Sequence, residues 1–107
     1  MKVVIVQWGS EGGAPVMGHH LYSALYESRF QVELVDIANI CLHDYLYSVA
    51  HEVPIYEARS RLVHDYFSAS PMPDLCIVNC LRSAFAVSAL KDLGSMVILY
   101  AHEGPAE

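Results

Sequence analysis

The sequence predicts an α/β domain: a Rossmann-like three-layer sandwich in which a four-stranded parallel sheet lies between helices. Three observations lead to this class. Four short apolar runs alternate along the chain with stretches of helical periodicity. Three of these runs, residues 3–6, 75–78 and 96–101, contain no charged residue, which is typical of strands buried on both faces of a parallel sheet. The 107 residues suffice for a single domain with one core.

The first half of the chain contains two strands and one clear helix. The β-branched run at 3–6 predicts the first strand, and alternation of apolar and polar residues predicts the second at 30–37. Between them a helix is expected over 15–28, opened by a proline that suits its first turn. The segment 38–54 is ambiguous between a short helix and an ordered loop. The helical stripe is formed by Met17, Leu21, Ala24 and Leu25.

The second half repeats the alternation. A helix is predicted over 56–70 and a third strand over 75–78, separated by the breaker "PMPD". Ser83 is expected to cap a third helix that runs to residue 93, and Gly94 to stop it. The fourth strand is expected at 96–101, "MVILYA".

The order of elements predicts right-handed crossovers and a Rossmann-like strand order of 3-2-1-4. The fourth strand is then an edge, yet "MVILYA" carries none of the charges or prolines that protect edges. It resembles an inner strand whose neighbour is missing. Residues 1–107 are therefore interpreted as one Rossmann-like domain, either the N-terminal part of a larger protein or a chain that forms a homo-oligomer.

Composition supports this interpretation and excludes several classes of function. Hydrophobic residues make up 54% of the chain and charged residues 17%, against about 25% charged in average domains. The net charge of −6 argues against binding to nucleic acid or to an anionic membrane surface. No run is long enough for a transmembrane segment. Three cysteines make no disulfide framework, so a cytoplasmic location is expected.

Glycines surround the junction between the first strand and the first helix. Gly12 and Gly13 would let a phosphate approach the free N–H groups at the helix start; alternatively they only shape a turn. The spacing does not match the dinucleotide pattern G-x-G-x-x-G or the P-loop. Asp36, at the end of the second strand, stands where an acid that binds ribose would lie, or caps a turn.

The end of the fourth strand places His102 and Glu103 beside this glycine loop in the expected strand order. A histidine there would act as a base or hydrogen-bond donor, or would be an ordinary loop residue. The other histidines lack the spacing of a metal site, so neither a metal nor a cofactor is expected. Cys76 and Cys80 are expected in the core, whereas the place of Cys41 is undetermined.

Taken together, three segments resemble the N-terminal half of GT-B glycosyltransferases, notably the retaining family 4 type. They are "VVIVQWGSEGGAPVMGHHLYSAL", "FQVELVD" and "PDLCIVNCLRSAFAVSALKDLGSMVILYAHE", which cover nearly the whole chain. Pro15 departs from the Glu or Ser that relatives often carry. The matching positions are Gly12, Gly13, Ala14, Pro73, Asp74, Asn79, His102 and Glu103.

The resemblance implies a domain on the acceptor side of an enzyme that transfers a sugar from a nucleotide-sugar donor. Gly12, Gly13 and Ala14 would contact the donor diphosphate, and His102 would be catalytic. Arg82, Ser83 and Glu103 would line the acceptor cleft. The donor-binding domain is absent from these residues, so the chain is expected to be inactive alone. Two alternatives are a small α/β interaction or regulatory domain and a nucleotide- or flavin-binding Rossmann-like domain.

Overall fold

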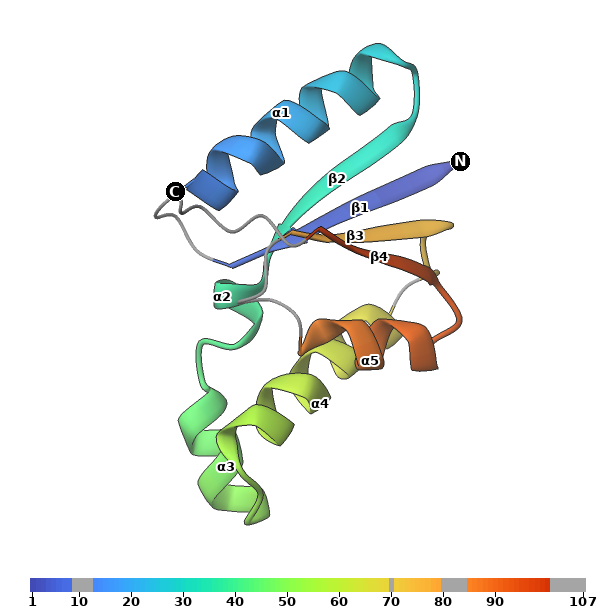
Figure 1. Cartoon of the computed structure of the whole chain (residues 1–107). Coiled ribbons are helices and arrows are strands. Elements are labelled where there is room, and N and C mark those ends of the chain that lie inside the picture. Colours follow the sequence, from blue (N-terminus) through green and yellow to red (C-terminus); the bar gives the residue numbers. More distant parts are fainter. Residues whose placement is uncertain (9–12, 70, 80–84, 101–107) are drawn as a thin grey trace.

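The computed structural model describes residues 1–8, 13–69, 71–79 and 85–100. Strands and helices alternate along them, and the predicted α/β class is confirmed (Figure 1). The elements are β1 (Lys2–Gln7), α1 (Gly13–Glu27), β2 (Gln31–Asp36), α2 (Ile37–Ile40), α3 (Asp44–His51), α4 (Ile55–Ser68), β3 (Leu75–Asn79), α5 (Ala86–Asp92) and β4 (Met96–Tyr100).

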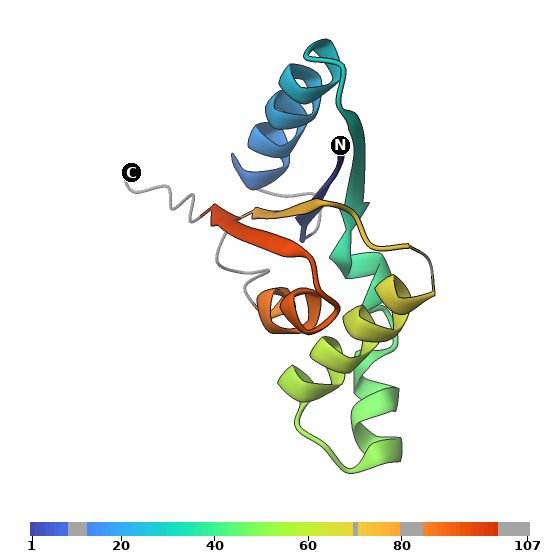
Figure 2. The same cartoon turned by 90° about the vertical axis from the view of Figure 1, so that its right-hand side faces the viewer.

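The four strands form one sheet in which every pairing is parallel. Helix α1 packs on one face of this sheet, over β1 and β2, while α4 and α5 lie on the opposite face (Figures 1 and 2). The result is the expected three-layer arrangement. Helix α5 ends just before Gly94, whose φ of 94° is the left-handed conformation expected of a glycine that ends a helix. No helix within the described ranges has the length and apolar character needed to cross a membrane.

The ambiguous segment between β2 and α4 is helical. Asp36 begins it, because its Oδ1 accepts a hydrogen bond of 2.9 Å from the backbone N–H of Ala38 at the start of α2. Helix α3 follows and carries Asp44 in its first turn, where a negative charge is favourable. It packs against α4 and extends the helical layer beyond the sheet (Figure 1).

The predicted strand order of 3-2-1-4 is wrong, because the sheet runs β2-β1-β3-β4. β1 pairs with β2 on one side and with β3 on the other, and β4 follows β3. After β2 the chain therefore passes back over β1 through α4, and β3 is added on the other side of β1. β4 is an edge of the sheet, as predicted, but the second edge is β2 and not β3.

The polarity of the strands explains this order. β2 has the sequence "QVELVD", with Gln31 and Glu33 exposed, and polar residues are tolerated at the edge of a sheet. β3 has the sequence "LCIVN", whose Cys76, Val78 and Asn79 are completely buried. A strand like β3, whose side chains are mostly apolar and buried, is suited to a position between two neighbouring strands.

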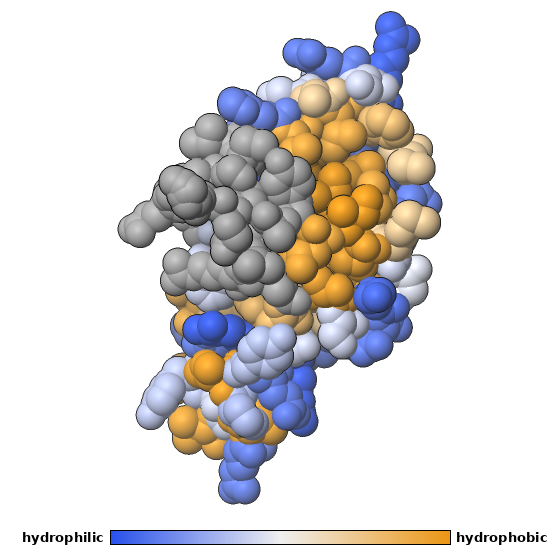
Figure 3. Space-filling view, viewed as in Figure 1, coloured by the Kyte–Doolittle hydropathy of each residue, from blue (hydrophilic) through white to orange (hydrophobic). Residues whose placement is uncertain are grey.

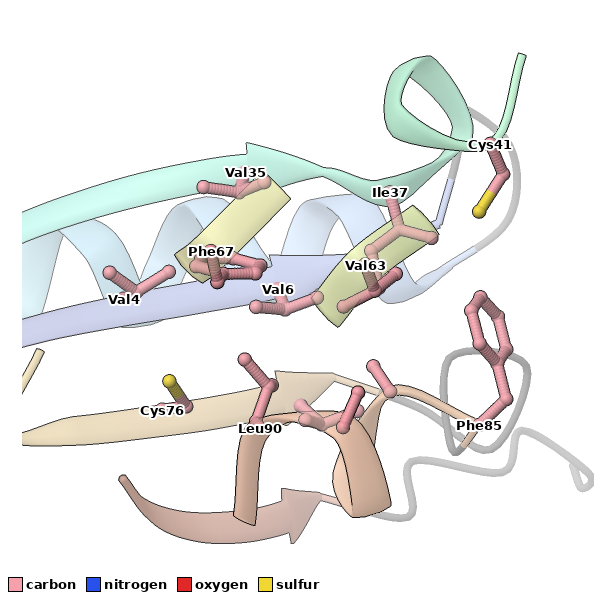
Figure 4. Close-up of a cluster of buried hydrophobic side chains, with 13 residues drawn as sticks. Val4, Val6, Val35, Ile37, Cys41, Val63, Phe67, Cys76, Phe85 and Leu90 are labelled. Carbon is pink, nitrogen blue, oxygen red and sulfur yellow. The ribbon is translucent and has the colours of Figure 1, made fainter. Parts of the chain in front are cut away.

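The main core lies between the sheet and the helices α4 and α5 (Figure 4). Val4 and Val6 of β1 are almost fully buried there, against Val63 of α4 and Leu90 of α5. Cys76 points into the same core, as expected. Its members are Val4, Val6, Val35, Ile37, Cys41, Val63, Phe67, Cys76, Val78, Phe85, Ala86, Ala89 and Leu90.

Asp74 joins the starts of β1 and β3. Its backbone N–H donates to the Lys2 carbonyl at 3.0 Å, and its carboxylate accepts from the Lys2 N–H at 2.8 Å. These two bonds fix the register of the central strand pair, so the acid of the "PD" motif has a structural role.

The opposite face of β3 and β4 is apolar and open. Because side chains alternate along a strand, Met96 and Ile98 lie on the face away from the α5 core, next to Leu75 and Ile77. Met96 is 69% exposed and Ile98 is 49% exposed. Figure 3 shows an apolar surface spread over the sheet between α1 and α5. We call Leu75, Ile77, Met96 and Ile98 the β4 face.

Candidate functional site

The candidate site lies at the carboxyl ends of β1 and β3. In an open parallel sheet, ligands bind at the carboxyl ends of the strands, at the point where the strand order reverses. Here that point lies between β1 and β3, because β2 is added on one side of β1 and β3 on the other. Helix α1 begins at Gly13, close behind the end of β1, and no acidic residue occupies its first turn. The first N–H groups of a helix have no partner within the helix, and in α1 these groups lie at this edge of the sheet.

Two residues with amide side chains lie at the carboxyl ends of β1 and β3. Gln7 is the last residue of β1 and is 4% exposed, and Asn79 is the last residue of β3 and is completely buried. Asn79 Nδ2 donates a hydrogen bond of 3.2 Å to Gln7 Oε1. A buried amide without a hydrogen bond costs about 1–3 kcal/mol, so this bond holds both strand ends in place.

Gly18 of α1 makes room for this pair. A Cβ atom at position 18 would lie 1.8 Å from Gln7 Oε1, far inside van der Waals contact. The same atom would lie 3.3 Å from Asn79 Nδ2. Glycine at this position thus lets α1 pack directly on the buried amides, which fixes where the helix starts relative to the strand ends.

A cluster of aromatic side chains lies at the same edge of the sheet, on the face that α4 covers. Trp8, the residue after β1, meets Phe85 edge to face with ring centroids 6.1 Å apart. Tyr56 of α4 contacts the same phenylalanine ring at 6.1 Å, also edge to face. Such pairs favour this geometry and contribute about 0.5–1.5 kcal/mol each beyond the area that they bury.

Arg59 of α4 links the aromatic group to α3. Its guanidinium lies 5.0 Å from the centre of the Trp8 ring, within the range of a cation–π interaction. Its Nε donates to Asp44 Oδ2 at 2.7 Å, and this ion pair is partly buried. Burial raises the pKa of the Cys41 thiol to about 11, against the opposing effect of Arg59. Cys41 therefore stays protonated near neutral pH and is a poor nucleophile.

The structure describes only some of the site residues predicted from the sequence. Gly12, Arg82, Ser83, His102 and Glu103 lie outside the described residues, as does Cys80, so their predicted binding, catalytic and core roles stay predictions. The expected cap of the third helix by Ser83 is wrong, because α5 begins at Ala86 and its N-cap residue is Phe85. Gly13 and Ala14 open α1, at the carboxyl edge where a diphosphate contact was expected. Asp36 has a structural role as the cap of α2.

The strand order changes the expected neighbours of the glycine loop. The prediction placed the end of the fourth strand next to it, yet the last residue of β4, Tyr100, pairs with Asn79 of β3 and not with β1. Neighbouring strands lie about 4.8 Å apart, so the end of β4 is about 10 Å from the end of β1. The strand directly beside β1 on that side is β3.

Sequence reasoning missed the packing role of Gln7 and Gly18. A signal was present, because both buried apolar runs, "VVIVQ" and "LCIVN", end in an amide residue. Gly18 has no comparable signal, since an isolated glycine within a helical pattern shows nothing about what faces it. Within the described part of the chain, no three metal-binding side chains come together.

Fold and site define a class of protein: a parallel α/β domain with a glycine-rich junction between strand and helix at its switch point. The chain matches no known family model, no curated protein and no solved structure.

Proposed function

We propose that this chain is the acceptor-side domain of a GT-B glycosyltransferase, which transfers a sugar from a nucleotide-sugar donor together with a second domain. In this proposal the segment at Gly12, Gly13 and Ala14 contacts the donor diphosphate, and His102 lines the reaction centre. Arg82, Ser83 and Glu103 belong to the acceptor cleft.

One observation carries the proposal: α1 begins at Gly13, at the carboxyl end of the central strand β1, with no acidic residue in its first turn. The partial positive charge of a helix start favours an anion, and a carboxylate there would oppose it. The bond between Gln7 and Asn79 and the close approach at Gly18 support it, because they hold the helix start in a fixed position.

The open β4 face supports the need for a second domain or a second copy of the chain. An exposed edge strand with large apolar side chains is a site of association. In the proposal this face packs against a neighbour, and the chain alone cannot hold a nucleotide sugar against an acceptor. Transfer assays on the 107 residues should therefore give no product above background, and clear turnover would contradict the proposal.

A second candidate has an observation of its own in its favour. The strand order β2-β1-β3-β4 is that of flavodoxin-like folds, which bind flavin mononucleotide at the switch point between their first and third strands. That function predicts tight binding of a flavin by this chain alone, whereas the glycosyltransferase proposal predicts weak binding of a nucleoside diphosphate.

The test is to titrate the chain with uridine diphosphate and, separately, with flavin mononucleotide, following backbone amide shifts by NMR. We expect uridine diphosphate to bind with a Kd of about 1 mM, equivalent to about −4 kcal/mol, and to shift the amides at the start of α1. Gly13→Asp puts a carboxylate at the helix start and should weaken this binding at least about fivefold. Ser23→Asp, an exposed site later in α1, is the matched control and should leave it unchanged.

Each outcome separates the candidates. Equal weakening by both variants would show that overall charge governs binding, and would contradict a site at the helix start. Micromolar binding of flavin with no response to uridine diphosphate would replace the proposal by the second candidate. If neither ligand shifts the amides of α1, the glycine segment only shapes a turn.

A further inference from the structure

The β2 edge of the sheet is polar, unlike the β4 edge. Among the described residues, no strand pairs with its outer side. The N–H of Gln31 donates to the carbonyl of Met1 at 3.2 Å, so the backbone groups of alternate residues from Gln31 onward point to β1. Those of Val32 and Leu34 consequently point outward. They offer donors and acceptors to an additional strand.

Hollows lie along this edge on both faces of the sheet. On the α4 side, a hollow of about 590 Å³ extends between β2, α2 and α4, and its walls include Leu62 and Tyr66. A second hollow of about 320 Å³ continues it and shares Tyr66 with it. On the α1 side, a hollow of about 350 Å³ is formed by His19 and Tyr22 against β2.

This arrangement suits an added strand. Successive side chains of a strand point to opposite faces of the sheet, so a segment paired with Val32 and Leu34 would place alternate side chains in the hollows on the two faces. Such addition of a strand to an exposed sheet edge is a general mode of peptide recognition, with the backbone supplying affinity and the side chains supplying specificity.

The charge of the hollow of about 590 Å³ indicates the occupant. Glu33, Asp36 and Asp65 line it, and the described lining contains no Lys or Arg. Lys2 pairs with Glu33 at 3.8 Å, but both side chains are about half exposed and such a pair contributes little. The chain itself carries a net charge of −6, so a second copy would bring like charges together along this edge. A partner with positive side chains is favoured.

We propose that the β2 edge binds an extended, basic segment of another protein, in which Lys or Arg alternates with apolar residues and which joins the sheet as a fifth strand. The cations lie next to Asp65 and Glu33 on the α4 side of the sheet. The apolar side chains point to the other face and contact Tyr22 and Val32 on the α1 side. This surface is separate from the glycine junction and from the β4 face.

The test uses the full chain and a short fluorescein-labelled peptide in which Lys and Val alternate. Fluorescence polarisation should show saturable binding that weakens as salt is raised. Asp65→Lys should weaken it about tenfold, because this exposed carboxylate faces the peptide. Asp92→Lys, the same charge change on the exposed end of α5, is the matched control and should weaken it less than about threefold.

A second peptide has the same side chains but N-methylated backbone amides, so it keeps its charge and cannot pair with a strand. We expect it to bind about tenfold more weakly, because it loses the backbone hydrogen bonds. Equal binding of the two peptides would overturn strand addition in favour of charge attraction. Equal effects of Asp65→Lys and Asp92→Lys would overturn the location, and no binding of the Lys–Val peptide at about 1 mM would overturn the proposal itself.

Discussion

At the scale of single residues, the site depends on two buried amides and the glycine that faces them. An amide buried without a partner costs about 1–3 kcal/mol, so Gln7 and Asn79 are stable inside the sheet because they bond to each other. The lack of a side chain at Gly18 keeps that bond intact under α1. Polar groups thus set the distance between α1 and the sheet at the carboxyl ends of β1 and β3.

Gly18→Ala tests this role. Alanine favours a helix over glycine by about 1 kcal/mol, so at an open site the change would stabilise the protein. Here the new Cβ displaces Gln7 from Asn79, and we expect the free energy of unfolding to fall by about 2–3 kcal/mol, measured with urea. Ser23→Ala, at an exposed position of the same helix, is the control and should change it by less than about 0.5 kcal/mol.

The clash can be isolated by repeating the change in a Gln7→Ala background. Without the Gln7 side chain, Gly18→Ala should cost less than about 1 kcal/mol. If the costs of the two substitutions simply add, the contact between positions 7 and 18 does not set the position of α1.

At the scale of elements, the sequence predicts the class of the fold and all four strands, but not their order in the sheet. Periodicity is local, and it identifies β2 and β3 with nearly correct ends. The direction of the crossover after β2 depends on which strand gains more from burial on both sides. The exposed Glu33 in β2 and the buried Cys76 and Val78 in β3 agree with the observed order, but their burial follows from the fold and not from the local pattern. The contacts of Gly18 and Arg59 join distant segments and leave no local pattern.

Arg59 connects the element α3 to the carboxyl edge of the sheet. Arg59→Lys keeps the charge but loses the planar guanidinium over Trp8 and the Nε donor to Asp44. We expect a loss of about 1 kcal/mol in unfolding free energy and a decrease in Trp8 fluorescence anisotropy. Arg61→Lys in the same helix, where Arg61 forms an exposed pair with Glu57, should change it by less than about 0.5 kcal/mol. Equal losses would mean that Arg59 is no more than a surface charge.

At the scale of the whole molecule, the two open edges of the sheet are opposite in character. β2 is lined by carboxylates, whereas β4 exposes Met96, Ile98 and Leu99. Aqueous solvent tolerates the first edge and disfavours the second. The two edges therefore differ in the partners that we propose for them: a basic segment at β2, and an apolar surface at the β4 face.

Ile98→Lys tests the apolar edge. We expect the wild-type chain to self-associate as its concentration rises in sedimentation velocity, and the Ile98→Lys chain to stay monomeric, because a charge blocks apolar contact and strand pairing. Leu42→Lys alters an equally apolar residue that is 69% exposed between α2 and α3, and should leave association unchanged. A wild-type chain that is monomeric at every concentration would contradict a homo-oligomer formed through the β4 face. A covalently linked domain would then be the expected neighbour of this face.

The position of β1 has a consequence for synthesis of the chain. β1 is synthesised before the other described elements, yet it lies in the middle of the sheet, and its pairing with β3 joins residues 72 positions apart. During translation it can pair with β2 alone, and one side of an apolar strand stays open until residues 75–79 have emerged. Closing so long a loop is slow, and open strand edges invite aggregation. We therefore expect the nascent chain to be most prone to aggregation between the synthesis of β1 and that of β3.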